Sequence, residues 1–390
     1  METMIYGENC TLPKEYLEQL MRQGLEGLPD LVREIVNEAM QIERENYLQA
    51  RPYERSEARQ GHANGYKPKT VKTRVGEVTF DIPQVREGGF YPRSLEKGMR
   101  SERALLLALA EMYVQGISTR KVAAVTERLC GTQVSTSQVS RAAKQLDEEL
   151  EAWRMRPLGE VDYLFMDARY EKVRQAGTVQ DAAILMACGV KKDGKRSILG
   201  ISVSLSEAEM HWRSFLTGLV KRGLCGVQLI ISDDHLGLEA ARKEIFTGVP
   251  WQRCQFHLQQ NAQAYVPRVG MRREVAEDIR TIFNAPDREM AEAFLKKAVD
   301  KYARLAPKLA DWMEVNLPEG FTVFSFPKIH QRRLRTSNQL ERLSQEIKRR
   351  TRIVRVFPND QSCLRLISSI LMEVGEDWEY GRLYLQMDSG

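Results

Sequence analysis

Apolar residues recur at helical spacing in the first part of the chain. Leu17 and Leu20 begin one apolar stripe, and a second stripe follows after Gly27 and Pro29, which interrupt the pattern. A stripe of this kind lets one side of a helix pack against the rest of a protein. We therefore predict a pair of helices over residues 12–50.

An alternation of apolar and polar positions replaces the helical spacing over residues 59–92. Val71, Val78 and Phe80 are typical strand residues, and glycines and prolines punctuate the segment. The alternation predicts short strands in a small basic β-segment.

Helical spacing then returns in three short pieces, with glycines where helices should end. The pieces cover residues 101–115, 118–130 and 135–150. Ser118 and either Ser135 or Ser137 are typical N-caps. Short helices joined by tight turns are typical of a DNA-binding helix-turn-helix, but any three-helix bundle has the same periodicity. The spacing alone leaves DNA binding and plain packing equally open.

Strand and helix patterns alternate in the next part of the chain. The predicted strands cover residues 161–167, 182–190, 198–205, 227–231 and 250–253, and the predicted helices cover 207–223 and 236–246. The first three strands follow one another and predict an antiparallel meander. The order β-β-β-α-β-α-β is that of a ribonuclease H-like domain.

After Cys254 the pattern is helical for roughly seventy residues, and it ends near Pro318. A new helix is predicted to begin near Thr336, because Thr336 and Gln339 have the spacing of a capping box. We interpret the helical stretch as an all-α insertion between the last strand and the final helix of the α/β unit.

Composition places the chain among globular proteins, since 43% of its 390 residues are hydrophobic and 28% are charged. No apolar run approaches the ~20 residues of a membrane span, and the N-terminus lacks a signal-peptide pattern, so we expect a cytoplasmic protein without a membrane partner. The six cysteines contain no Cys-x-x-Cys pair, which predicts neither a disulfide framework nor a four-cysteine zinc site.

The formal net charge is only +5, but basic residues gather in two segments. Residues 67–100 hold eight Lys or Arg against four acids, and residues 328–355 hold ten against two. A charge run is usually a solvated face, yet ten cations against two acids repel one another unless an anion binds. We therefore expect double-stranded DNA as a partner. The candidate DNA-binding residues are Lys67, Lys69, Lys72, Arg74, Gln138, Arg141, Lys144, Arg332, Arg333, Arg335, Arg349 and Arg350.

Two acids lie where neighbouring strands of the predicted sheet end. Asp167 ends the first predicted strand, Asp233 follows the fourth, and Glu341 falls on the last helix of the unit. A single Asp at a strand end is more often a turn residue. Carboxylates that converge from separate elements are, however, what phosphodiester cleavage by two divalent ions requires. The three acids together indicate a metal site.

Strand parity separates these acids from their neighbours. In the predicted strand through Leu229 and Ile231, the next side chain on the same face is Asp233, not Asp234. The same rule places Asp162 on the face opposite to Asp167.

Helical geometry separates Glu341 from Glu346. Positions five residues apart lie about 140° apart around a helix, so both acids cannot reach one metal pair. Glu346 has Arg349 and Arg350 at helical spacing, which predicts ordinary ion pairs, whereas Glu341 has no basic residue at those spacings.

Cys254 and His257 form half of a zinc signature, and no second pair stands at ligand spacing. We favour a packing and hydrogen-bonding role, with contact between His257 and the scissile phosphate as the alternative. Trp251 and Trp312 are able to stack on an unpaired base, but core packing is the commoner state of a tryptophan.

Several short motifs occur in a fixed order along the chain. They are Asn64-Gly65-Tyr66, residues 116–120 (GISTR), residues 166–170 (MDARY), Arg222-Gly223-Leu224, residues 232–238, residues 251–254 with His257, residues 337–342 and Phe357-Pro358-Asn359. From about residue 60 to 365 the chain thereby resembles bacterial insertion-sequence transposases of the Mutator type, which belong with the Mutator-like group to the DDE recombinase superfamily.

The resemblance implies a ribonuclease H-like catalytic domain with an all-α insertion, dependence on Mg²⁺ or Mn²⁺ with two ions per active site, and binding to terminal inverted repeats. It also implies that Asp167, Asp233 and Glu341 form the catalytic triad, accompanied by the Cys254 and His257 pair. Two positions depart from the family pattern: Gln260 stands where an Arg usually precedes Asn261, and Asp234 stands where Ala is common.

The predicted fold class is an α/β ribonuclease H-like catalytic domain interrupted by an all-α insertion and preceded by helical and small β DNA-binding segments. The predicted boundaries are 1–60 for the N-terminal helical region, 61–100 for the basic β-segment, 101–155 for the helix-turn-helix-like domain, 156–258 for the first part of the catalytic domain, 259–325 for the all-α insertion, and 326–390 for the second part with the C-terminal helix.

The predicted function is that of a DNA transposase that cleaves transposon ends and joins the 3′-hydroxyl to target DNA. Synapsis of two ends predicts a homodimer or a larger assembly, in the bacterial cytoplasm and associated with the nucleoid. One alternative is a ribonuclease H-like nuclease or resolvase that cuts without joining. The other is a non-catalytic DNA-binding regulator built on residues 101–150, against which the three carboxylates argue.

Overall fold

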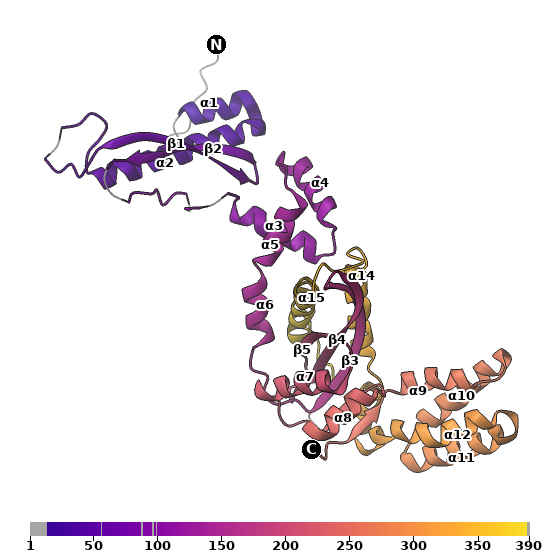
Figure 1. Ribbon diagram of the computed structural model, residues 1–390. Coiled ribbons are helices and arrows are strands. Elements are labelled where there is room, and N and C mark those ends of the chain that lie inside the picture. Colours follow the sequence, from indigo (N-terminus) through magenta and orange to yellow (C-terminus); the bar gives the residue numbers. More distant parts are fainter. Residues whose placement is uncertain (1–13, 56, 87–88, 96, 99, 388–390) are drawn as a thin grey trace. The chain divides into compact units, whose positions relative to one another are not determined.

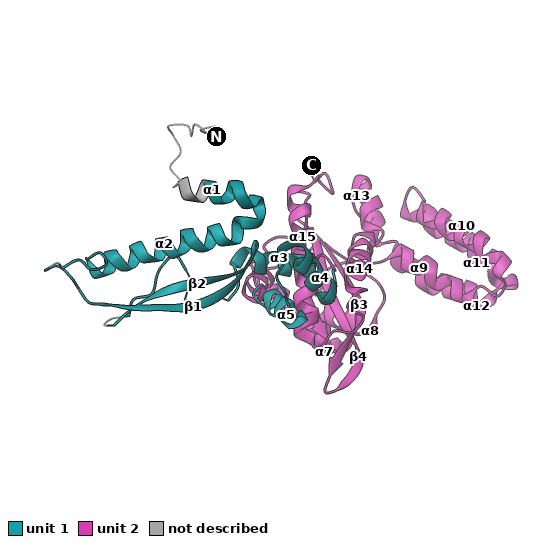
Figure 2. Ribbon diagram, turned by 90° about the horizontal axis from the view of Figure 1, so that it is seen from above, with its two compact units in different colours: residues 1–113, 117–145 teal, residues 114–116, 146–390 magenta. Residues whose placement is uncertain are grey.

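The computed structural model describes residues 14–55, 57–86, 89–95, 97–98 and 100–387. Two compact units divide the chain (Figures 1 and 2). The first unit consists of residues 1–113 and 117–145, and the second of residues 114–116 and 146–390. Across the described ranges, no helix combines the length and the apolar character that crossing a membrane demands.

The first unit begins with helices that pack on a β-hairpin. Its elements are α1 (Lys14–Gln23), a 3₁₀ turn (Gly24–Gly27), α2 (Leu28–Leu48), β1 (Ala63–Thr73) and β2 (Gly76–Val85). The two strands pair antiparallel. Met40 of α2 packs on Val71, Val78 and Phe80, which alternate with exposed residues along the strands. The predicted helix pair and the predicted β-segment are both confirmed.

Three helices complete the first unit: α3 (Arg103–Val114), α4 (Thr119–Cys130) and α5 (Thr136–Lys144). The hydroxyls of Ser118 and Ser135 cap α4 and α5. Gln138 closes a capping box with Ser135, so Ser135 rather than Ser137 is the cap.

The helix predicted over residues 135–150 is instead two helices. The first is α5, and the second, α6 (Asp147–Arg154), already belongs to the second unit. Acidic residues fill the first turn of α6, where the helix dipole favours negative charge. Asp147 also accepts two hydrogen bonds from the Arg365 guanidinium of the second unit. The compact units therefore meet at residue 145, not at the predicted boundary of 155.

The second unit is a mixed α/β structure around one five-stranded sheet. Its strands are β3 (Tyr163–Gln175), β4 (Thr178–Val190), β5 (Arg196–Ser204), β6 (Leu229–Ser232) and β7 (Trp251–Arg253), in the order β5-β4-β3-β6-β7. Strands β3, β4 and β5 pair antiparallel, while β6 runs parallel to β3 and β7 parallel to β6. The predicted meander and the adjacency of the first and fourth strands are confirmed.

The first strand of this sheet is longer than predicted. It continues beyond Asp167 to Gln175 and turns into β4 through Ala176 and Gly177, both at positive φ. Val173 is the only buried residue in the last stretch of β3 that follows Asp167. This polar composition hides the strand from apolar patterning, and Asp167 lies inside β3 rather than at its end.

Helices cover both faces of the sheet (Figure 1). Helices α7 (Glu209–Lys221) and α8 (Leu236–Ile245) pack through Trp212 and Leu238 on the face that presents Leu164 and Met166. Helices α14 (Asn338–Thr351) and α15 (Asp360–Tyr380) also contact β3. Since side chains alternate along a strand, Asp167 points to the face opposite to Leu164 and Met166.

A group of helices separates β7 from α14 in the chain. Its members are α9 (Gln255–Ala262), α10 (Arg272–Phe283), α11 (Arg288–Leu305) and α12 (Pro307–Asn316), with short 3₁₀ turns at Gln263–Tyr265, Val269–Met271, Leu317–Gly320 and Thr322–Ser325. These helices share a core that includes Ile279, Tyr302 and Leu309. The predicted helical stretch is confirmed.

Helix α13 (Lys328–Leu334) follows this group and leads to α14. The predicted capping box of Thr336 and Gln339 does not form. Ser337 is the N-cap of α14, and no side-chain hydrogen bond caps the helix. The Ser337 hydroxyl donates to the sulfur of Cys254 instead, which explains the missing cap.

Candidate active site

Strand pairing brings Asp167 and Asp233 to the same level of the sheet. Strands β3 and β6 pair in parallel, and the last pair of their ladder joins Phe165 to Ile231. Asp167 and Asp233 each follow two residues later. Because side chains of equal parity share a face, both carboxylates emerge on the side of Phe165 and Ile231.

The neighbouring acid Asp234 is directed elsewhere. Asp233 Oδ2 lies 3.9 Å from His257 Nδ1, whereas Asp234 Oδ2 lies 3.2 Å from the guanidinium of Arg253. The structure therefore brings Asp233, and not Asp234, to the other candidate residues, as strand parity predicts.

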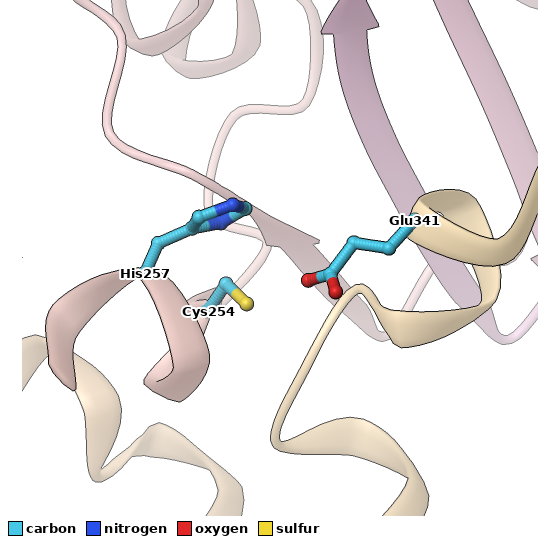
Figure 3. A group of neighbouring side chains, drawn as sticks. All are labelled: Cys254, His257 and Glu341. Atoms are coloured by element: carbon cyan, nitrogen blue, oxygen red, sulfur yellow. The ribbon is translucent and has the colours of Figure 1, made fainter. Parts of the chain in front are cut away.

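Helix α14 carries Glu341 to the same place. Leu340, Leu343 and Ile347 are buried and seat this helix, as the apolar stripe predicts. Glu341 lies in the first turn, and Figure 3 shows its carboxylate pointing toward Cys254 and His257. One ligand atom from each of these three residues lies within 4.8 Å of the others.

Charge interactions place all the candidate acids around Asp167. Burial raises the pKa of the Asp167 carboxyl to about 6, while the Ala168 amide and the charge of His257 act in the opposite direction. The carboxylates of Asp233 and Glu341 add to the rise. Burial also raises the pKa of Glu341, and His257 partly offsets that rise. Several acids thus share a small space in which a cation would relieve their repulsion.

Three polar atoms of this cluster are buried without a hydrogen-bond partner among the described residues. They are Asp233 Oδ1, Glu341 Oε1 and His257 Nδ1. Buried polar atoms are nearly always satisfied, so each exception requires an explanation such as an ion. Carboxylate oxygens are the preferred ligands of Mg²⁺ and Mn²⁺, so the two acids fit such a site.

The atoms that lie closest together suggest a different metal, because a sulfur, nitrogen and oxygen set suits Zn²⁺ better than Mg²⁺. The sulfur of Cys254 is already occupied, however. It accepts hydrogen bonds from the backbone amide and the hydroxyl of Ser337, at 3.4 and 3.3 Å. We therefore favour the carboxylates as the metal-binding set.

His257 is a cation within this cluster at neutral pH. Burial lowers the pKa of its imidazole, but the hydrogen bond and charge of Cys254 and the charges of Asp233 and Asp167 raise it to about 9. Burial raises the pKa of the Cys254 thiol, and the contacts with His257 and Ser337 bring it below its ordinary value. His257 therefore places a positive charge beside the acids.

The other nearby acids all have protein partners. Glu346 accepts hydrogen bonds from Arg349 and Arg350, which hold its pKa at about 2 against the opposing effect of burial. Glu171 accepts from Arg169 and from Thr351. Asp162 accepts from Gln228. The ion pairs predicted for Glu346 are confirmed.

Most of the candidate DNA-binding residues of the first unit lie on its surface. Lys67, Lys69, Lys72 and Gln138 line a cavity of about 620 Å³ together with Arg100, which the sequence analysis did not select. Arg141 and Lys144 are exposed on α5. Arg74 is exposed as well, but Glu102 already neutralises it.

The basic residues of the second unit divide into two groups. Arg332 and Arg333 are exposed on α13, and Arg349 is exposed but pairs with Glu346. Arg335 is half-buried and donates to Asn284.

Arg350 requires a correction. It is only 4% exposed and binds Glu346 and Glu373, so it holds α14 to α15 and is not available as a surface contact for DNA. Its sequence position within a basic run gave no sign of this.

The two tryptophans pack as the commoner alternative predicts. The Trp251 indole donates to the Ser232 hydroxyl at 2.9 Å, and the Arg242 guanidinium lies 4.2 Å from its ring centre. Trp312 stacks on Tyr265 with ring centres 5.5 Å apart.

Comparison with known proteins identifies the family. A family model described as "Transposase, Mutator family" matches residues 10–381. The chain is 56% identical over 371 residues to the transposase for insertion sequence element IS406 of Burkholderia multivorans, which covers 95% of this chain and 96% of that protein. It is 41% identical over 373 residues to the transposase for ISRM5 of Rhizobium meliloti, covering 95% and 94%. The chain belongs to the Mutator family of transposases.

More distant relatives agree. The transposase for IS256 in transposon Tn4001 of Staphylococcus aureus is 36% identical over 389 residues, covering 97% of this chain and 98% of that protein. A solved simian T-cell lymphotropic virus intasome is 12% identical and covers 53% of this chain and 66% of that chain, but its TM-score of 0.19 is too low to show a common fold.

Proposed function

We propose that this transposase binds the terminal inverted repeats of its insertion sequence, cleaves the element ends and joins the resulting 3′-hydroxyl to target DNA. The observation that carries the proposal is the convergence of Asp167, Asp233 and Glu341 from β3, the end of β6 and α14. Asp233 and Glu341 each retain a buried oxygen without a hydrogen-bond partner among the described residues.

The sheet of the second unit supports a ribonuclease H-like catalytic domain with an all-α insertion. Three antiparallel strands come first, followed by two strands parallel to the first of them, with helices between. Ligands of α/β sheets bind beyond the carboxyl ends of parallel strands. Asp233 stands at such an end, and Asp167 lies at the same level on the neighbouring strand.

Asp167, Asp233 and Glu341 would hold two divalent ions, Mg²⁺ or Mn²⁺. When bound, such ions activate a water or a 3′-hydroxyl and stabilise the charge on the transferred phosphate. The chain then requires no Ser or Tyr nucleophile. The imidazolium of His257 lies beside Asp233, where it is placed to donate a hydrogen bond to a DNA phosphate and to balance the charge of the acids.

The first unit supplies the DNA recognition in this proposal. Its basic cavity offers Lys67, Lys69, Lys72 and Arg100 to DNA phosphates, and the exposed face of α5 offers Arg141 and Lys144 to a major groove. Gln138 contributes less to base readout than the sequence predicts, because its side-chain oxygen accepts the Ser135 amide in the capping box. Joining two element ends to one target requires at least a dimer.

One experiment tests the proposal. Purified full-length protein is incubated with labelled element-end DNA, a target plasmid and Mg²⁺ or Mn²⁺, and the products are mapped at nucleotide resolution. We expect cleavage that exposes a 3′-hydroxyl, followed by joined products, and neither with Asp167→Asn. Cleavage without joining would indicate a nuclease or resolvase. Specific binding without cleavage, unchanged in Asp167→Asn, would indicate a DNA-binding regulator.

A further inference from the structure

One residue contacts both segments that precede the acids of the candidate site. Cys254 links β7 to α9 and is completely buried. Its backbone amide donates to the carbonyl of Ser232 at 2.8 Å, and Ser232 directly precedes Asp233. Its sulfur accepts from the amide and the hydroxyl of Ser337, the N-cap of α14. Cys254 therefore bridges the end of β6 and the start of the helix that carries Glu341.

The contacts on either side of Cys254 support the same bridge. The amide of Gln255 donates to the carbonyl of Arg335 at 2.9 Å, two residues before Ser337. Trp251, on the preceding strand, donates to the Ser232 hydroxyl. The segment from Trp251 to Gln255 thus holds Ser232 on one side and Arg335 with Ser337 on the other.

The start of α14 depends on this sulfur. The hydroxyl of an N-cap serine ordinarily accepts a hydrogen bond from its own helix, but that of Ser337 does not. It donates to Cys254, and so does the Ser337 amide. The orientation at which α14 leaves residue 337 determines where Glu341, one turn later, points its carboxylate.

We propose that Cys254 is a positioning residue that fixes Asp233 and Glu341 relative to each other, and that its sulfur acts as a hydrogen-bond acceptor and not as a metal ligand. This inference rests on the proposed function, since it concerns the acids that would hold the ions. It assigns separate tasks to the two members of the Cys-x-x-His pair: Cys254 sets the geometry, and His257 supplies charge beside the acids.

The test measures Mn²⁺ binding to the full-length protein without DNA, by calorimetry or by the electron paramagnetic resonance of free Mn²⁺. We expect Cys254→Ala and Ser337→Ala each to weaken Mn²⁺ binding by on the order of tenfold to a hundredfold, as the loss of contacts that orient metal ligands does elsewhere. Cys254→Ser should restore part of the affinity, since a hydroxyl still accepts a hydrogen bond. The double variant should bind no worse than the weaker single variant, because both changes remove one contact.

Cys363→Ala is the matched control, since Cys363 is equally buried and lies on α15. It should bind Mn²⁺ like the unaltered chain. Thermal melting by circular dichroism accompanies each variant, and Ser337→Ala carries the test should Cys254→Ala fail to fold. Cd²⁺ addition should produce no thiolate-to-cadmium absorption band that disappears in Cys254→Ala.

Three results would overturn the inference: unchanged Mn²⁺ affinity in folded Cys254→Ala or Ser337→Ala, additive losses in the double variant, or a cadmium band that depends on Cys254. These measurements need no DNA. The proposed function fails separately, if the unaltered chain binds Mn²⁺ but neither cuts nor joins element ends.

Discussion

The carboxylate of Asp234 lies 3.2 Å from the guanidinium of Arg253, a side chain only 5% exposed. Arg253 also contacts Glu319 and Asn316, so it forms a buried centre for polar groups. This pairing accounts for the second acid after β6 without assigning it to the metal site. It leaves Asp233 as the member of the pair that meets His257.

Asp233→Asn and Asp234→Asn should therefore differ sharply. We expect Asp233→Asn to reduce metal-dependent end cleavage to the limit of detection, since the amide removes a negative ligand. Asp234→Asn should retain substantial cleavage, although the lost partner of Arg253 should lower the melting temperature. Gel analysis of labelled ends, with circular dichroism for folding, measures both effects. Equal loss of cleavage in two folded variants would contradict the assignment.

Glu341→Gln and Glu346→Gln form a second matched pair on one helix. Glu341 keeps a buried oxygen that no described residue satisfies, while Glu346 is held by Arg349 and Arg350. We expect cleavage to disappear in Glu341→Gln and to persist in Glu346→Gln. Activity that survives in Glu341→Gln, or loss confined to Glu346→Gln, would refute the choice of third acid.

Arg169 should act through the position of α14. It lies two residues after Asp167 on the same face of β3, and its guanidinium donates to the carbonyl of Ser344, one turn after Glu341. We expect Arg169→Met to weaken Mn²⁺ binding by on the order of tenfold to a hundredfold. Titration of Mn²⁺ without DNA measures this change. Lys172→Met, an exposed change on the same strand, is the control and should have no effect.

Glu346 predicts a specific pH dependence of stability. Its pKa in the folded protein is about 2, below its ordinary value, so its stabilising charge is fully present above the ordinary pKa and is lost as the pH falls toward 2. In urea unfolding, the unaltered chain should exceed Glu346→Gln in stability at about pH 6, and the difference should shrink toward about pH 3. A difference that stays constant across this range would contradict the ion pairs.

The two groups of basic residues in the first unit should affect DNA binding differently. Lys67→Ala should weaken binding to repeat and random DNA alike and reduce the salt dependence by about one phosphate contact. Arg141→Ala should cost ~1–3 kcal/mol on repeat DNA and relax its preference over random DNA. Fluorescence anisotropy at several salt concentrations separates the two. Uniform weakening by Arg141→Ala would exclude base readout by this side chain.

The sequence predicts the elements that carry periodic apolar residues. The predicted insertion helix over 272–283 matches the bounds of α10, and the strand adjacency behind Asp167 and Asp233 is confirmed. The polar end of β3 was missed, because beyond Asp167 this strand extends past the core and needs no apolar face. Local spacing also misjudged Ser337, whose hydroxyl is drawn to a cysteine more than eighty residues away.

The same limit applies to the candidate site. Parity and helical angle select Asp233 and Glu341 because they depend only on local geometry. The burial of Arg350 and the pairing of Arg74 with Glu102 depend on partners distant in sequence, so a count of basic residues could not reveal them. The role inferred for Cys254 likewise requires contacts among three separated segments.

The group of helices between β7 and α14 places more than a hundred residues of chain between Asp233 and Glu341. During synthesis, the first unit, Asp167 and Asp233 leave the ribosome well before Glu341, and contacts between distant segments form late in folding. The acidic cluster is therefore completed only when almost the whole chain has been made. A chain terminated before α14 would keep the proposed DNA-binding unit but lack the third acid, so it would occupy element ends without cutting them and compete with the intact transposase.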